Sequence, residues 1–247
     1  MIARPVRIVA ACMALLLVGA VGYLAHLGYY GSEIYRLQPA RRAPPAGRAG
    51  IVAVFLSGDS GLNAGMASTV TGTLADRGIP VLGVNSLTAF KNGKTPAETR
   101  ALVADATRRA LRLPGARRVV LIGQSFGADM LQYGVADLPA ALRSRVVQVI
   151  LTVPGDTLLF TASPGGLLDG PPDGPALPSA RHIDWVPVLC VYGREETTSL
   201  CPSLHAANVR VVALPGGHYL HHDGPRLADL LWDTILRATP AKAVSHA

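Results

Sequence analysis

The folded part of this sequence lacks the basic surface that a nucleic-acid-binding protein needs. The net charge of +7 comes mainly from residues 1–50, where six of the 23 basic residues stand against one of the 16 acidic ones, Glu33. That leaves 17 basic and 15 acidic residues in 51–247, with no run of Lys or Arg interleaved with aromatic side chains. So small and scattered a charge argues against nucleic acid as a partner.

Asp, Glu, Lys and Arg are also missing from residues 8–32, directly after Arg4 and Arg7. The apolar stretch Ile8–Leu24 is 17 residues long, at the short limit for crossing a bilayer. Residues 1–32 are therefore expected to be a signal peptide or a membrane anchor and not part of the fold, with cleavage and retention both open. The two arginines favour a cytoplasmic N-terminus and an exported, periplasmic domain.

Cysteine is scarce, which bears on compartment and on metal binding. Outside the apolar segment only Cys190 and Cys201 occur, 11 positions apart. In an exported protein such a pair is expected to form a disulfide, the alternative being two buried free thiols. No group of His, Cys and Asp has metal-ligand spacing, so the sequence predicts neither a metal nor a cofactor.

The remaining chain alternates apolar runs with segments of helical period. Residues 33–50, rich in Pro and Arg, are expected to be a stiff, solvated tether. After it, continuous apolar runs predict six strands covered on both faces, at 51–57, 79–85, 117–123, 146–153, 186–193 and 209–216. Helical spacing occurs at 63–77, 96–112, 126–137 and 225–238. The alternation predicts an α/β domain over 51–240, with a doubly wound, mostly parallel sheet of about six strands.

One segment, residues 154–185, breaks this alternation. It holds six prolines and five glycines and has no convincing period. A long loop in a compact domain is usually functional or mobile. Because it leaves the end of a strand, where doubly wound sheets bind ligands, we expect a small lid.

Two serines follow predicted strands, and either is a candidate nucleophile. Ser60 lies in Gly-Asp-Ser, a block that resembles the GDSL hydrolases, but that family has an acid three residues before its histidine. No histidine here has a carboxylate at that position. Ser125 lies in G-x-S-x-G between a strand and a helix, which is the context that this motif requires. Ser125 is therefore the preferred nucleophile.

A nucleophilic serine needs a base and an acid, which in this architecture follow it in the order acid, then histidine. His218 directly follows the last predicted strand and two glycines. His182, His205, His221, His222 and His246 are the other candidate bases. The acid should follow the preceding strand, where Glu195 and Glu196 both stand; Glu196 is preferred, and the choice stays open. A bridge between the two cysteines would hold this turn in place.

The stretch FLSGDSGL (55–62) is expected to form part of the site around Ser125. In the α/β-hydrolase plan, one backbone N–H of an oxyanion hole comes from the residue after the serine and another from a loop after an earlier strand. Phe126 follows Ser125, and Gly58 and Asp59 belong to that loop. These three residues are therefore expected to stabilise the oxyanion.

Five stretches share their order with a known family: SGDSGL (57–62), GIPVLGVNSLTAF (78–90), GQSFGAD (123–129), CVYGREETTSLCP (190–202) and PGGHY (215–219). Together they resemble the VirJ/AcvB family of bacterial virulence proteins, over about residues 51–237. The sequence departs from the family's pattern at Ser60, Ala89 and Gln124.

The resemblance implies an exported α/β-hydrolase that cleaves aminoacyl-phosphatidylglycerol, with Ser125 as nucleophile, His218 as base and the acid in the CVYGREE turn. A cationic aminoacyl group would need a carboxylate, which Asp59 or Asp129 would supply; the alternative for Asp129 is a carboxylate that meets the helix dipole. The expected partners are a phospholipid substrate, the membrane surface and proteins of secretion or virulence. Arg36, Arg41, Arg42 and Arg48 are expected to face anionic headgroups.

Two other functions stay open at this stage. The domain would be a non-catalytic binding module if the hydrolase fold serves only as a scaffold, since fold does not fix function. It would be a general carboxylesterase or lipase if the site accepts small or fatty esters. Neither the amino acid in the ester nor the oligomeric state follows from the sequence.

Overall fold

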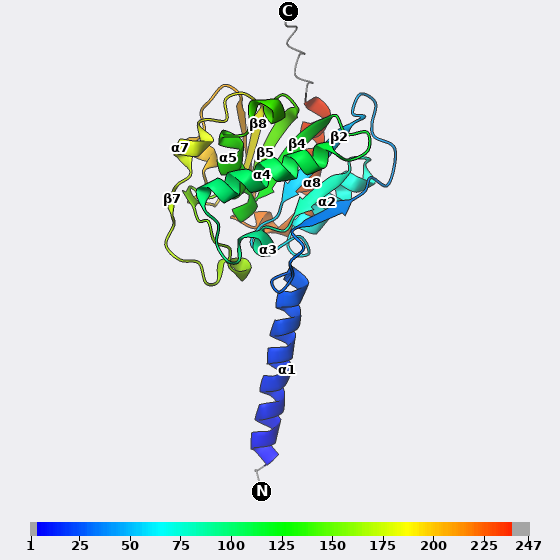
Figure 1. Cartoon of the computed structure of the whole chain (residues 1–247). Helices are drawn as coiled ribbons and strands as arrows, with labels where there is room; N and C mark the ends of the chain where they lie inside the picture. The colour runs from blue at the N-terminus through cyan, green and yellow to red at the C-terminus, as the bar shows by residue number, and fades with distance from the viewer. Residues whose placement is uncertain (1–3, 239–247) are drawn as a thin grey trace, which may run out of the picture.

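A seven-stranded sheet organises the chain in the computed structural model, which describes residues 4–238 (Figure 1). The strand order is β1-β3-β2-β4-β5-β8-β9, and all neighbours are parallel except β1 and β3. The strands are β1 (Tyr35–Gln38), β2 (Ile51–Leu56), β3 (Val81–Val84), β4 (Arg118–Gln124), β5 (Val146–Thr152), β8 (Val188–Gly193) and β9 (Val209–Leu214). The predicted doubly wound, mostly parallel α/β sheet is confirmed.

Helices cover both faces of this sheet, as the continuous apolar strands require. The helices are α1 (Arg4–Leu27), α2 (Ala67–Asp76), α3 (Ser86–Phe90), α4 (Pro96–Leu111), α5 (Phe126–Ala136), α6 (Ala140–Arg143), α7 (Leu177–Ala180) and α8 (Gly224–Arg237). Helices α4 and α5 pack together over one face, and α2 and α8 over the other. The side chains of β2 alternate between the two resulting cores, with Val54 in one and Phe55 in the other.

Local signals explain why α4 begins where the sequence predicts. Thr95 caps the helix: its hydroxyl accepts a hydrogen bond from the backbone N–H of Glu98, and the Glu98 carboxylate accepts one from the backbone N–H of Thr95. Pro96 occupies the first turn, where a missing N–H costs nothing. The helix therefore starts at a sharply defined position beside the sheet.

The sheet has one strand more than the six predicted, because β1 lies inside the segment interpreted as a tether. Its residues pair antiparallel with β3, from Tyr35 opposite Val84 to Gln38 opposite Val81. The chain then continues to the end of the sheet at which the parallel strands begin. There the Arg41 N–H donates to the carbonyl of Ala75. Residues 33–50 thus run along the domain and do not separate it from α1.

This path also changes the expected position of the arginines. The register of β1 takes the chain from the carboxyl edge of the sheet, at which the parallel strands end, toward the edge at which they begin. Arg41 pairs with Asp76, and Arg48 donates to the carbonyl of Leu236. Arg41, Arg42 and Arg48 therefore lie away from the C-terminal end of α1, contrary to the headgroup-facing position expected for them. Only Arg36 lies on β1 itself.

The apolar segment forms the long helix α1, which projects from the domain (Figure 1). Residues Ile8–Leu27 have a mean hydropathy of 2.4 and are long and apolar enough to cross a membrane. The sequence interpretation placed this segment outside the fold, but Leu27, at the end of the helix, is only 1% exposed and belongs to the hydrophobic core. The end of the helix is thus part of the domain.

Residues 154–185 form short elements above the carboxyl edge of the sheet. The elements are β6 (Thr157–Leu158), the 3-10 turn η1 (Pro164–Gly166), β7 (Gly174–Pro175) and α7. Strands β6 and β7 pair with each other in a separate two-stranded sheet. The 3-10 turns η2 (Cys201–Ser203) and η3 (Leu220–His222) follow β8 and β9.

Candidate active site

Ser125 stands on a tight turn between β4 and α5. Its backbone has φ 52° and ψ −128°, a conformation that a residue with a side chain adopts only when its surroundings force it. The flanking glycines permit the turn, because a Cβ on Gly123 would lie 2.6 Å from the Cα of Ala128, and one on Gly127 would collide with the carbonyl of Ser57. The G-x-S-x-G pattern therefore places the Ser125 hydroxyl above the carboxyl edge of the sheet.

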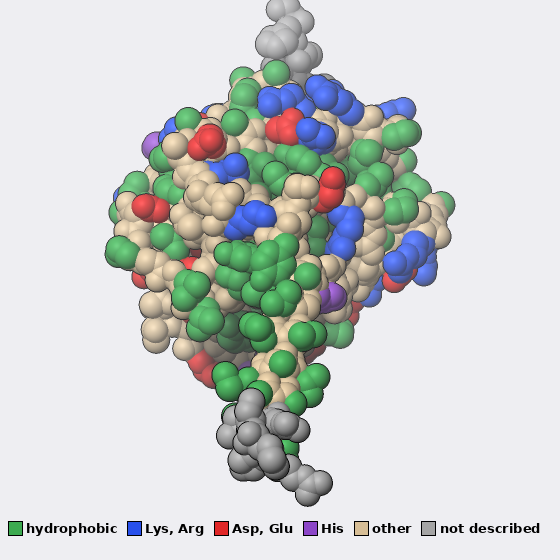
Figure 2. All heavy atoms as spheres, turned by 60° about the horizontal axis from the view of Figure 1, so that its bottom comes forward, with side chains coloured by type: hydrophobic (Ala, Val, Ile, Leu, Met, Phe, Trp, Pro, Cys, Tyr) green, Lys and Arg blue, Asp and Glu red, His purple; other side chains and the backbone are tan. Residues whose placement is uncertain are grey.

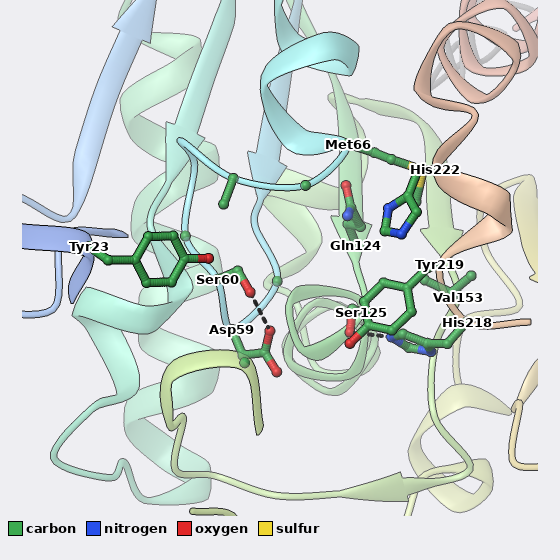
Figure 3. Close-up of a pocket in the computed structure, with 15 residues that line it drawn as sticks. Tyr23, Asp59, Ser60, Met66, Gln124, Ser125, Val153, His218, Tyr219 and His222 are labelled. Carbon is green, nitrogen blue, oxygen red and sulfur yellow. Dashed lines mark hydrogen bonds between the residues drawn. The ribbon is translucent and has the colours of Figure 1, made fainter. Parts of the chain in front are cut away.

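His218 meets this hydroxyl from the loop after β9. Its Nε2 lies 2.7 Å from Ser125 Oγ, across 93 positions of sequence (Figure 3). The end of β8 packs tightly against the same loop, because a Cβ on Gly193 would collide with the carbonyl of Gly217. The N–H of Glu195 also donates to the carbonyl of Gly216. These contacts fix the path of the loop that carries the imidazole.

The structure places Glu196, and not Glu195, beside the imidazole. Glu196 Oε1 lies 2.6 Å from His218 Nδ1, and the Glu196 side chain is only 5% exposed. Glu195 points outward, with 69% of its side chain exposed and 3.9 Å between its carboxylate and His221 Nε2. With the proton on Nδ1, the ring donates to Glu196 and can accept the hydroxyl proton of Ser125 at Nε2.

The predicted disulfide between Cys190 and Cys201 is present, and both residues are fully buried. Cys190 lies in β8 and Cys201 opens η2, so the bridge closes the turn that carries Glu196. Cross-links of this kind restrict the chain on both sides of the loop that they close. The disulfide therefore holds the carboxylate in register with His218.

Backbone N–H groups beside Ser125 are available to an oxyanion. Among the described residues, no hydrogen bond is found from the N–H of Gly58, Asp59 or Phe126. A Cβ on Gly58 would lie 3.5 Å from Ser125 Cβ, so this loop contacts the serine directly. The Ser57 hydroxyl fixes the loop by accepting from the N–H of Ser86 and donating to the carbonyl of Gly58. The predicted oxyanion residues are thus gathered around Ser125.

Carboxylates line a hollow of about 240 Å³ on one side of Ser125. Asp59, Asp129 and Asp169 all border it, and the Oδ2 atoms of Asp59 and Asp169 both lie within 3.4 Å of the position that a Cβ on Gly166 would occupy. Asp129, half-buried, accepts a hydrogen bond of 2.8 Å from the N–H of Gly155. We call this the acidic hollow.

Burial raises the pKa of two of these carboxyl groups. Desolvation raises the pKa of Asp59, the nearby charge of Asp169 adds to the rise, and the Ser60 hydroxyl opposes it. Desolvation raises the pKa of Asp129 well above its usual range, and the charge of Glu196 adds to this rise. Burial destabilises the ionised form of both carboxyl groups. A cation bound beside them would compensate this negative charge.

A second hollow, of about 340 Å³, opens on the other side of Ser125 (Figure 3). Its wall includes Met66, Tyr219 and Tyr23, the last from α1. The Tyr219 ring packs edge-on against the His218 ring, with 5.6 Å between centroids. We call this the aromatic hollow. Ser125 lies where the two hollows meet.

The other candidates from the sequence lie elsewhere. Ser60 contacts Asp59 and no imidazole, which leaves it without a base. His222 stacks on Tyr219, and His221 lies beside Glu195. His246 lies outside the described residues. Within residues 4–238, no group of three or more His, Cys, Asp or Glu side chains could hold a metal ion.

Asp169 and Tyr23 are among the residues of the site that were not found from the sequence. Asp169 lies in the segment interpreted as a lid, where it is one of four aspartates in a Pro/Gly-rich stretch and nothing in the sequence distinguishes it. Tyr23 lies in the apolar segment that the interpretation set apart from the fold. Both reach the site through tertiary contacts, which local sequence patterns do not encode.

Solved structures with this architecture are α/β-hydrolases. Est1E from Butyrivibrio proteoclasticus, bound to ferulic acid, is 16% identical with a TM-score of 0.60, covering 83% of this chain and 94% of that one. Esterase Pf2001 from Pyrococcus furiosus is 16% identical with a TM-score of 0.57, covering 76% and 81%. A dienelactone hydrolase from Anabaena variabilis is 16% identical with a TM-score of 0.59, covering 83% and 91%. The chain therefore has the α/β-hydrolase fold.

A match to a family model assigns the chain to one family of this class. Residues 50–239 match the family described as bacterial virulence protein (VirJ), which is most of the chain. The protein belongs to the VirJ family. No curated protein matches the sequence.

Proposed function

We propose that the protein is an exported, periplasmic serine hydrolase that cleaves the aminoacyl ester of aminoacyl-phosphatidylglycerol, of the lysyl or alanyl type. The observation that carries the proposal is the unbroken chain of short contacts from Ser125 through His218 to Glu196, beside unpaired backbone donors. The esterases among the structural neighbours and the VirJ match support it. The N-terminal apolar helix and the disulfide fit an exported protein.

The proposed reaction is acyl transfer in two steps. His218 Nε2 takes the proton of Ser125 as Oγ bonds to the ester carbon, and the oxyanion accepts hydrogen bonds from Phe126 and the loop at Gly58 and Asp59. The C–O bond to the lipid glycerol then breaks, and the protonated imidazole gives its proton to the departing oxygen. Water, deprotonated by His218, attacks the acyl-serine and releases the amino acid. Glu196 orients the ring and stabilises its cationic form.

The acidic hollow is the basis for proposing an aminoacyl ester. Every such ester carries an ammonium group on the carbon next to the reacting carbonyl, which a fatty acyl ester lacks. A carboxylate near Ser125 would bind this group and be relieved of its own desolvation penalty. Asp59 and Asp129 are the proposed partners of the ammonium, and Asp169 adds a third carboxylate.

The test compares two esters with one preparation of the full-length protein. Release of lysine from lysyl-phosphatidylglycerol in vesicles is measured beside hydrolysis of p-nitrophenyl acetate. We expect Asp59→Asn to lower kcat/KM for the lysyl lipid about tenfold or more, and to change that for the neutral ester little. Asp184→Asn, an exposed aspartate outside the site, is the matched control. Equal losses on both esters would contradict the role of the acidic hollow.

Two further outcomes would assign the alternative functions. Efficient cleavage of the neutral ester with no release of lysine would identify a general carboxylesterase. Failure of a fluorophosphonate probe to label Ser125 in the folded protein, with no activity on either ester, would indicate a non-catalytic module of secretion or virulence.

A further inference from the structure

The C-terminal end of α1, at Leu27, which we call its outer end, is held by the loop after β2 and by the start of α3. The carbonyl of Leu27 accepts a hydrogen bond of 3.0 Å from Asn85 Nδ2, and that of His26 accepts one of 2.6 Å from Asn63 Nδ2. Thr88 donates to the next carbonyl, that of Gly28, at 2.9 Å. The last carbonyls of a helix have no partner within it and need such donors. The domain therefore caps α1.

The chain after the helix is fixed in the same way. Lys91 Nζ donates to the carbonyls of Tyr29 and Gly31, at 2.7 Å each. The backbone of Gly61, in the loop that continues from the oxyanion residues, packs so closely on α1 that a Cβ there would collide with the carbonyl of Leu27. A helix held from its last turn onward cannot swing freely relative to the domain. Its axis therefore sets the orientation of the active site.

This orientation puts the aromatic hollow at the level of a membrane surface. The apolar span Ile8–Leu27 has 20 residues, of which only Leu27 at its end is buried by the protein. At 1.5 Å per residue this length matches a hydrocarbon core of about 30 Å. Its outer end lies at Leu27. Tyr23, one turn earlier, lines the aromatic hollow and points toward Ser60 (Figure 3). One wall of the hollow thus belongs to α1 itself.

Large apolar side chains are exposed around this hollow. Leu167 and Leu168 are 83% and 77% exposed and directly follow η1, whose Gly165 lines the hollow. Tyr219, on the opposite wall, is 65% exposed. Figure 2 shows hydrophobic side chains where the helix meets the domain, with most Lys and Arg side chains of this face farther away. Tyrosines and leucines in this position are typical of a protein surface in contact with lipid headgroups.

We propose that α1 is retained as part of the enzyme and that the aromatic hollow opens onto the outer surface of the bilayer, with Leu167 and Leu168 inserted among the lipids. An ester lipid then enters from the membrane past Tyr23, and its acyl group reaches the acidic hollow beyond Ser125. The docking of the helix does not depend on catalysis, whereas the entry route rests on the proposed hydrolase function.

The orientation is tested without any activity measurement. Leu168→Cys and Ala141→Cys are each made in a Cys12→Ser background, which removes the free thiol of α1. Ala141 is an exposed residue of α6. Because α6 directly precedes β5, it lies at the end of the sheet where the parallel strands begin, away from the two hollows. Each variant of the full chain is labelled with the fluorophore NBD and reconstituted into phosphatidylethanolamine/phosphatidylglycerol vesicles.

We expect a blue-shifted emission and strong quenching by nitroxide-labelled lipids at position 168, and neither at position 141. Equal responses at the two positions would overturn the proposed orientation, whether or not the protein hydrolyses any ester.

The entry route is tested with Leu167→Ser/Leu168→Ser, which should fold normally because both side chains are exposed. We expect turnover of lysyl-phosphatidylglycerol in vesicles to fall fivefold or more, with hydrolysis of p-nitrophenyl acetate and fluorophosphonate labelling unchanged. Unchanged turnover of the lipid would overturn the entry route alone. Absence of labelling and turnover in the wild-type protein would instead overturn the proposed function and the entry route with it, and leave the orientation to the fluorescence result.

Discussion

Two adjacent glutamates differ in what surrounds them, and this difference gives a direct test of the site. Glu196 is buried against His218, whereas Glu195 extends into solvent. We expect Glu196→Gln to lower kcat by roughly 10³–10⁴-fold, because an amide no longer stabilises the imidazolium. Glu195→Gln is the matched control and should change kcat less than threefold. Similar kcat values for the two variants on p-nitrophenyl acetate would rule out Glu196 as the orienting acid.

Asp129 is expected to reduce the stability of the folded protein at neutral pH. Its pKa is raised in the folded state, so the folded protein binds more protons than the unfolded chain between the two pKa values, and stability falls as pH rises through that window. Asp129→Asn removes this penalty and keeps an oxygen to accept from Gly155. We expect a higher Tm at pH 8, by about 2–4 °C for each kcal/mol removed. The difference should disappear at a pH below the ordinary aspartate pKa; a lower Tm at pH 8 would contradict it.

How far the sequence predicted the site depends on which contacts are local. The turn at Ser125 follows from its own glycines, and the order of strand ends explains why His218 and the acidic turn were expected to approach it. The choice between Glu195 and Glu196 stayed open because adjacent residues in a turn point in different directions, and the local sequence does not indicate which of them faces the imidazole. Asp169 was not identified, because a segment without period carries no signal for where it folds back.

Among the elements, the disulfide links stability to the position of the acid. The bridge between Cys190 and Cys201 is expected to stabilise the fold by about 2–3 kcal/mol, the value for a short closed loop. Cys190→Ala/Cys201→Ala should therefore lower Tm and also lower kcat on p-nitrophenyl acetate, because Glu196 is no longer held.

Cys12→Ser, which removes the exposed cysteine of α1, is the control and should change neither quantity. A variant with lower Tm but unchanged kcat, measured below its own Tm, would show that the bridge stabilises the domain without positioning the acid.

The element missed by the sequence interpretation shows where such patterns fail. The six parallel strands have continuous apolar runs, and each was predicted near its observed position. Five of them are largely buried as expected, whereas β9, at one edge of the sheet, is partly exposed. Strand β1 has the sequence YRLQ and an exposed centre, because it lies at the edge of the sheet. Four residues of mixed polarity beside a Pro/Arg-rich stretch give no period to detect. The edge strand forms because β3 offers it a free row of backbone groups.

For the molecule as a whole, the capping of α1 determines which processed forms would remain functional. Cleavage within residues 28–32 would remove Leu27 from the core and leave the amides of Asn63 and Asn85 without their carbonyl partners. Leaving the buried amide of Asn85 unpaired and losing a large buried side chain both destabilise a fold, whereas Asn63 is exposed to solvent. A mature protein of that kind would lose the support of the loop at Gly61 beside Ser125.

We therefore expect the mature protein to keep α1. Intact mass spectrometry of the protein purified from membranes should show a chain that includes residues 8–27, and alkaline carbonate should not extract it. A truncated variant starting at Ser32 should show a lower Tm and weaker fluorophosphonate labelling of Ser125 than the full chain. A soluble periplasmic form starting at or beyond residue 28, with a Tm and a labelling rate equal to those of the full chain, would show that the helix serves only for export. The hydrogen bonds to its last carbonyls argue against that outcome, because a helix used only for export has no need of partners in the domain that it delivers.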